Sequence, residues 1–82
     1  MAYFKIIDKT RKDGFVNTVS GASALFDEIE DIVGMKECPC NGIPYALEVE
    51  GWGELCAIGE IYETEDFVVE CLTLEEWLEY QD

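Results

Sequence analysis

The segment Ser20–Gly34, which reads SGASALFDEIEDIVG, decides how the rest of the chain is interpreted. Its apolar residues recur three and four positions apart, which predicts an amphipathic helix with one apolar face. These residues are Ala22, Leu25, Phe26, Ile29, Ile32 and Val33. Ser20 or Ser23 is available to cap the start of the helix, and Gly34 is typical of a helix end.

The residues before this helix predict a β-hairpin. Residues 2–8 (AYFKIID) and 15–20 (FVNTVS) are rich in β-branched and aromatic side chains. The segment between them contains Asp13-Gly14, a pair that readily adopts the positive φ angles of a tight hairpin turn. We therefore expect two antiparallel strands at the N-terminus.

The residues after the helix predict a loop and then three strands. Two prolines and Asn41-Gly42 make residues 35–44 a loop. Residues 45–50 (YALEVE) alternate apolar and acidic side chains, which is typical of a strand with one buried face. The segments GWGE at 51–54 and ETED at 63–66 are then expected to be turns, which leaves residues 55–62 and 67–74 as strands of an antiparallel meander.

The C-terminal residues 73–82 predict a short helix. Thr73 precedes Glu76 by three residues, which is the spacing of a capping box. Trp77 lies on the apolar side and is expected to pack against the rest of the protein. The predicted fold is therefore one α+β domain, residues 1–82, with the order ββ-α-βββ-α, in which an antiparallel sheet is packed by one main amphipathic helix and a short C-terminal helix.

The composition is that of a folded protein rather than an acidic tail. The chain has 82 residues, of which 49% are hydrophobic, so its charge must surround a real core. No apolar run approaches the roughly 20 residues that a membrane-spanning helix needs. The N-terminal sequence shows no secretory signal, so we expect a cytoplasmic protein with reduced thiols.

The charge is strongly negative and unevenly distributed. Nineteen acidic residues face five basic ones, and the net charge is −14. Residues 1–12 contain four of the five cations, whereas residues 13–82 contain only Lys36. Such a surface repels nucleic acid and anionic lipids and attracts basic proteins, so we expect a basic protein partner, with no direct nucleic-acid or membrane binding.

No catalytic motif accompanies this charge. Histidine, the commonest general base and the commonest neutral metal ligand, is absent from the chain. We therefore expect a protein that is not an enzyme and that needs no cofactor.

The acids of the predicted helix are the first candidates for a binding surface. No Lys or Arg lies between Gly14 and Met35, so the salt bridges usual on an exposed helix are missing there. We expect an unbroken negative ridge formed by Asp27, Glu28, Glu30 and Asp31. The other candidate partner-binding residues are Glu48, Glu50, Trp52, Glu54, Glu63, Glu65 and Asp66.

In size and charge the chain resembles the small acidic DNA mimics that phages and mobile elements encode, including antirestriction and anti-CRISPR proteins, although it shares no motif with them. This resemblance implies an inhibitor that occupies a basic groove on a partner, which could be a nucleic-acid-binding protein or complex. The alternative is a regulatory interaction module that grips its partner through Trp52 and apolar surface. Trp52 stands at the tip of a predicted turn, and the other interpretation is that it folds back over a sheet edge.

The four cysteines leave a third alternative open. Cys38, Cys40, Cys56 and Cys71 are enough in number for a tetrahedral zinc site in a small zinc-stabilised protein. Structural zinc sites usually offer two pairs with two to four residues between the thiols, and this chain has a single C-x-C. The favoured interpretation is that Cys56 and Cys71 are small buried side chains and that Cys38 and Cys40 lie in a loop.

Overall fold

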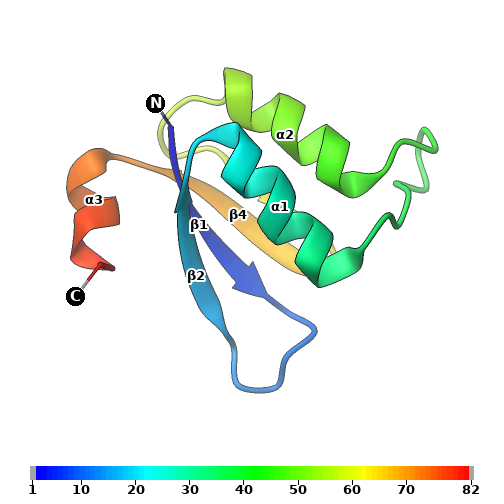
Figure 1. The fold of residues 1–82 in the computed structure, drawn as a ribbon, viewed down its shortest axis with the longest axis horizontal. Helices are drawn as coiled ribbons and strands as arrows, with labels where there is room; N and C mark the ends of the chain where they lie inside the picture. The colour runs from blue at the N-terminus through cyan, green and yellow to red at the C-terminus, as the bar shows by residue number, and fades with distance from the viewer. Residues whose placement is uncertain (1, 82) are drawn as a thin grey trace.

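The protein is an α+β domain, in which three helices accompany a four-stranded antiparallel sheet. The computed structural model describes residues 2–81 (Figure 1). In chain order the elements are β1 (Tyr3–Asp8), β2 (Val16–Ser20), α1 (Ala22–Val33), α2 (Tyr45–Leu55), β3 (Ile61–Glu63), β4 (Phe67–Leu72) and α3 (Leu74–Glu79). The α+β class is confirmed, but the order is ββ-α-α-ββ-α.

The sheet has the strand order β2-β1-β4-β3, so the first and last long strands lie side by side at its centre. β1 pairs with β2 in the predicted N-terminal hairpin, with Tyr3 opposite Ser20. On its other side β1 pairs with β4, with Phe4 opposite Cys71. Because β1 is central, the complete sheet joins the N-terminal hairpin to the C-terminal part of the chain.

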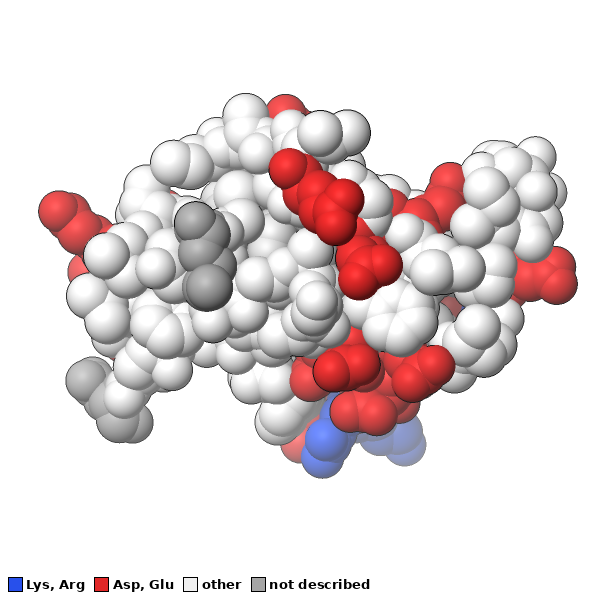
Figure 2. Space-filling model, turned by 45° about the horizontal axis from the view of Figure 1, so that its top comes forward, with Lys and Arg blue, Asp and Glu red and all other residues white. Residues whose placement is uncertain are grey.

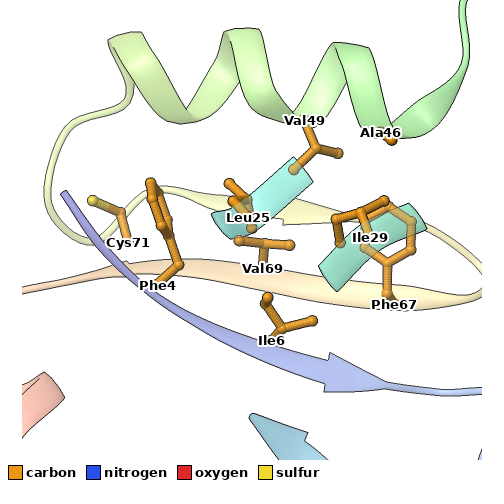
Figure 3. Close-up of a cluster of buried hydrophobic side chains, with 9 residues drawn as sticks. All are labelled: Phe4, Ile6, Leu25, Ile29, Ala46, Val49, Phe67, Val69 and Cys71. Atoms are coloured by element: carbon orange, nitrogen blue, oxygen red, sulfur yellow. The ribbon is translucent and has the colours of Figure 1, made fainter. Parts of the chain in front are cut away.

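The hydrophobic core lies between one face of the sheet and the helices α1 and α2, which run side by side across it (Figure 1). Figure 3 shows its side chains pointing toward one another from all these elements. The core residues are Phe4, Ile6, Leu25, Ile29, Ala46, Val49, Phe67, Val69 and Cys71. Alternate residues of β1 and β4 enter it, as the period of two in a strand requires.

Helix α1 confirms the prediction made from the segment Ser20–Gly34. Leu25 and Ile29 are fully buried, one turn apart. Gly34 ends the helix with φ of 62°, and its N–H donates to the Glu30 carbonyl over 2.7 Å. The expected serine cap is absent, since the cap position is occupied by Gly21, which has no side chain to accept a hydrogen bond.

Helix α2 corrects the prediction of a strand, a turn and a second strand across residues 45–62. The residues that α2 buries are Ala46, Val49 and Gly53, which follow the helical spacing i, i+3 and i+7. The alternation of Tyr45, Leu47 and Val49 was misleading, because Leu47 is exposed. The predicted three-stranded meander is therefore wrong, and only the short hairpin β3–β4 remains of it.

Gly53 explains why a helix can contain the sequence GWG. A Cβ atom at this position would lie 2.8 Å from Leu25 Cδ2 and 3.1 Å from Phe4 Cζ. The helix therefore approaches α1 and β1 more closely than any larger residue would allow. Gly51, two residues earlier, has no atom within 4 Å of its virtual Cβ and is not needed for this packing.

The C-terminal helix α3 confirms the predicted capping box. The Glu76 N–H donates to Thr73 Oγ1 over 3.1 Å, and the Thr73 N–H donates to Glu76 Oε1 over 3.0 Å. Trp77 packs on Tyr3, with ring centroids 5.0 Å apart. Tyr3 alternates with the core residue Phe4, so α3 covers the sheet face opposite α1 and α2. No helix within residues 2–81 is long and apolar enough to cross a membrane.

Candidate protein-binding surface

The acids of α1 lie on the side of the helix that faces away from the core. Asp27, Glu30 and Asp31 are exposed, and Glu28 is half-exposed at the flank of the helix. Their positions follow directly from the burial of Leu25, which fixes the rotation of the helix about its axis. The structure thus brings the four predicted acids together on one helix.

None of these four acids takes part in an ion pair within the described residues. The ion pairs of residues 2–81 are Lys5–Glu70, Lys9–Glu63, Arg11–Asp13 and Lys36–Asp66. All of them lie on the strands, the hairpin turns and the loop before α2. The negative charge of α1 is therefore not neutralised by the protein itself.

Helix α2 adds Glu50 and Glu54 to the same layer, and neither makes an ion pair in the described chain. Figure 2 shows carboxylates crossing the helical side of the molecule in a band, with Lys and Arg only at one margin. Uncharged side chains interrupt the band, so the predicted unbroken ridge is a discontinuous one. We call the following six residues the acidic helical surface: Asp27, Glu28, Glu30, Asp31, Glu50 and Glu54.

Glu48 was predicted to contact a partner, but in the structure its carboxylate accepts hydrogen bonds from other residues of the protein. Asn41 Nδ2 donates to Glu48 Oε1 over 2.7 Å, and the Tyr62 hydroxyl donates to Glu48 Oε2 over 3.2 Å. The hydrogen bond from Asn41, helped by those from Cys38 and Tyr62, lowers the pKa of the Glu48 carboxyl despite its partial burial. Glu48 therefore ties the loop before α2 to the hairpin β3–β4.

The remaining predicted acids lie away from the acidic helical surface. Glu63 is paired with Lys9 at 2.8 Å, and Asp66 is paired with Lys36 at 2.6 Å. Glu65 is exposed in the turn between β3 and β4. The structure therefore does not join these three carboxylates to those of α1.

Trp52 is half-buried within α2 rather than at the tip of a turn. Its ring lies 6.1 Å from that of Phe4 and 5.7 Å from that of Tyr62, measured between centroids. The aromatic packing continues to Phe67, whose ring is stacked on Tyr62. Burial here raises the pKa of the Tyr62 hydroxyl, and the neighbouring Glu48 raises it further. Trp52 thus folds back onto the core, one of the two positions expected for it.

Sequence reasoning missed a group of exposed apolar side chains at the end of α2. Leu55 is 89% exposed, Ile58 is 67% exposed and Ile61 is 58% exposed. The strand expected over residues 55–62 would have buried every second side chain of that segment. A signal was present in Gly59, because glycine is depleted in strands; in the structure it has a positive φ of 91° and lies in a loop.

The four cysteines are free thiols and fall into two groups, which are separated by the length of α2. Cys38 and Cys40 lie in the loop before this helix, and Cys56 follows its last residue. The helix has 11 residues and is therefore about 16 Å long. Within residues 2–81 no three His, Cys, Asp or Glu side chains are grouped so that they could hold a metal ion. The structure thus does not bring the four thiols together.

The second pair is packed into the core. Cys71 is buried, and Cys56 contacts the core at its edge. Burial, with a further contribution from the Cys71 thiol, raises the pKa of the Cys56 thiol to about 12. This agrees with the interpretation of Cys56 and Cys71 as small apolar side chains.

The chain matches no family model, no curated protein and no solved structure. Its function must therefore be argued from its own surface.

Proposed function

We propose that this protein is a non-catalytic cytoplasmic binding protein whose acidic helical surface occupies a basic groove on a partner protein. Its most specific form is a nucleic-acid-mimicking inhibitor, of the antirestriction or anti-CRISPR kind, from a phage or mobile element. One observation carries the proposal: within residues 2–81 the six carboxylates of this surface have no cationic partner, whereas four of the five cations are paired elsewhere.

The unpaired carboxylates of α1 repel one another and so destabilise the folded state. That the protein carries them in spite of this cost supports a role beyond solubility. Asp27 and Asp31 are one turn apart, and Asp27–Glu30 and Glu28–Asp31 are three residues apart. Each like-charge pair at such spacing destabilises a helix by about 0.2–0.5 kcal/mol, so the three pairs together cost roughly 0.6–1.5 kcal/mol. A single Lys on α1 would remove part of this cost, and a partner that carries positive charge removes it on binding.

The charge density supports nucleic-acid mimicry as the more specific form. Helix α1 has 12 residues and spans about 18 Å, so its four acids give one charge per roughly 4.5 Å. A DNA duplex carries one charge per roughly 1.7 Å of its axis. Helix α1 thus offers about two fifths of the linear charge density of DNA.

Association of this kind is fast and depends strongly on salt. Opposite charges steer the encounter, and the steering weakens as the Debye length falls from roughly 10 Å at 0.1 M salt to roughly 3 Å at 1 M. The partner is therefore to be captured from host extract at low ionic strength and identified by mass spectrometry. A basic, nucleic-acid-binding partner that duplex DNA displaces from the protein is the expected result.

The surface itself is tested by charge reversal with a matched control. The triple variant Asp27→Lys, Glu30→Lys, Asp31→Lys should lose the partner and keep the fold. The triple variant Glu65→Lys, Glu75→Lys, Glu79→Lys changes the net charge by the same amount away from this surface and should retain the partner.

Two outcomes contradict the proposal. Equal loss of binding in both triple variants would show that total charge, and not this surface, governs the interaction. Unchanged binding in the α1 variant would show that the contact lies elsewhere.

A regulatory interaction module remains the second candidate, and the exposed apolar side chains after α2 favour it. Leu55 and Ile58 stand out from the surface, and apolar anchors ringed by charge are typical of protein–protein interfaces. In this case the double variant Leu55→Ser, Ile58→Ser should weaken binding, and added salt should have little effect. Measuring the salt dependence of the captured complex separates the two candidates.

A further inference from the structure

A cavity lies between the loop that joins α1 to α2 and the hairpin β3–β4. Its volume is about 350 Å³. Cys38 and Cys40 line it from the loop, and Tyr45 and Tyr62 line it from α2 and β3. Both thiols of the Cys38-Pro39-Cys40 sequence therefore border the same space.

Hydrogen bonds hold this loop in a defined conformation. The Cys38 N–H donates to the Ile43 carbonyl over 2.8 Å, and the Gly42 N–H donates to the Cys38 carbonyl over 2.9 Å. Gly42 has φ of 73°, which a side chain would disfavour. Asn41 then fastens the loop to Glu48 on α2 over 2.7 Å. The two thiols are thus presented by a closed turn and not by a free segment.

The two thiols are neighbours on this turn. Cys38 and Cys40 are separated by a single residue and border the same cavity, with Cys38 half-buried and Cys40 exposed. The geometry therefore suits two sulfurs that act as a pair.

The charge around the cavity favours a cation. Glu63, Glu65 and Asp66 line its wall, and Lys36 is the cation that lines it. The Lys36 ammonium is paired with Asp66 at 2.6 Å. Glu63 is paired with Lys9, so Glu65 is the one of these three carboxylates that makes no ion pair in the described chain, and the wall keeps a net negative charge that attracts a cation and repels an anion.

We propose that Cys38 and Cys40 bind a soft cation that accepts two thiolate ligands, with Cu(I) as its representative. Soft thiolates select Cu(I), Zn(II) and iron–sulfur clusters. Structural zinc takes four ligands, and within residues 2–81 these thiols belong to no group of three or more His, Cys, Asp or Glu side chains that could hold a metal ion. The nearby Glu48 carboxylate is already bound by Asn41 and Tyr62. Each thiol releases one proton to solvent as its sulfur–metal bond forms, and the oxidation state of the metal does not change.

The other thiol pair is not an equivalent site. Cys71 is buried in the core beside β1, and neither it nor Cys56 lines the cavity. This makes Cys56→Ser a matched control, because it removes a thiol from the chain without touching the loop.

The test is an oxygen-free titration of the fully reduced chain with Cu(I) against a coloured Cu(I) chelator. We expect one equivalent of tightly bound Cu(I) and a new near-ultraviolet absorbance from thiolate-to-copper charge transfer. The double variant Cys38→Ser, Cys40→Ser should lose this equivalent, and Cys56→Ser should keep it. Retention by the double variant, or loss by Cys56→Ser, would overturn the assignment.

Two further measurements use the unchanged chain, so that misfolding of a variant cannot affect them, and they compare Cu(I) with Zn(II). Alkylation of the native chain by iodoacetamide, read by mass spectrometry, should be blocked by Cu(I) at Cys38 and Cys40 and unchanged at Cys56. Zn(II) at the same concentration should leave both loop thiols open to alkylation. Equal protection by Zn(II) would refute the two-ligand site, and protection at neither loop cysteine would refute the site altogether.

Discussion

The two glycines of α2 provide a direct test of the helix that sequence reasoning mistook for a strand and a turn. Gly51 and Gly53 stand in the same helix, two residues apart, and each is to be replaced by alanine. In a helix interior alanine is favoured over glycine by about 0.8–1.0 kcal/mol. The two substitutions thus share the same gain in helix propensity and differ only in their surroundings.

The surroundings predict opposite results. At Gly51 the new methyl group meets nothing within 4 Å, so Gly51→Ala should stabilise the protein by about 1 kcal/mol. At Gly53 the methyl group would lie 2.8 Å from Leu25 Cδ2 and 3.1 Å from Phe4 Cζ. Both neighbours are fully buried and cannot swing into solvent. Overpacking of this kind costs about 1–3 kcal/mol, so the net effect of Gly53→Ala lies between roughly zero and a loss of 2 kcal/mol.

The assay is thermal and urea unfolding followed by circular dichroism. For a domain of this size 1 kcal/mol corresponds to roughly 4–8 °C in Tm, so Gly51→Ala should raise Tm by about that amount and Gly53→Ala should not raise it. A fall in Tm for Gly51→Ala would mean that residue 51 is not in a helix. Equal increases for both variants would mean that α2 does not pack closely on α1 and β1.

Three further predictions concern the cap of α3, the charge of α1 and the alkaline limit of stability. Thr73→Ala removes the hydrogen bond from the Glu76 N–H and should cost about 1 kcal/mol in urea unfolding, whereas Thr73→Ser should retain most of the stability. Asp31→Lys replaces repulsion from Asp27 by attraction and places a cation in the last turn of α1, so it should stabilise the protein by about 1 kcal/mol at low salt and by less at 1 M salt. The pKa of Cys56 is raised from 9.0 to about 12, so the folded state holds this proton more tightly than the unfolded state; the resulting stability is fully present below pH 9 and is lost as the pH rises toward 12. Urea unfolding at stepped pH should therefore show a shallower alkaline decline for Cys56→Ala than for the unchanged chain, and parallel declines would contradict this reasoning.

The sequence predicted correctly those elements whose signals are local. The spacing of Leu25 and Ile29 rotates α1 onto the core, and Thr73 with Glu76 starts α3, both within a single turn. It failed for α2, because the side-chain period over residues 45–50 fits a strand and a helix alike. Only the position of Gly53 against Phe4 settles that ambiguity, and this contact depends on the tertiary fold.

The acidic surface was predictable in composition but not in extent. The absence of Lys and Arg from residues 15–35 already showed that α1 would lack ion pairs within the helix. The internal use of Glu48 could not be foreseen, since it depends on Asn41 and Tyr62, which the fold brings to it from a loop and a strand. The same holds for the pairing of Asp66 with Lys36 across 30 residues of chain.

The topology of the fold explains why the uneven distribution of charge along the chain leaves one side of the molecule strongly negative. Four of the five cations belong to β1 and the turn that follows it, and the elements α1 and α2 contain none. Since α1 and α2 are consecutive and cover the same face of the sheet, the fold gathers two cation-free segments into one layer (Figure 1). A different order, with a strand in place of α2 as the alternating pattern suggested, would have divided these acids between the two faces of the sheet. Helix α2, which the sequence pattern did not predict, is therefore also the element that concentrates the negative charge on one side of the molecule.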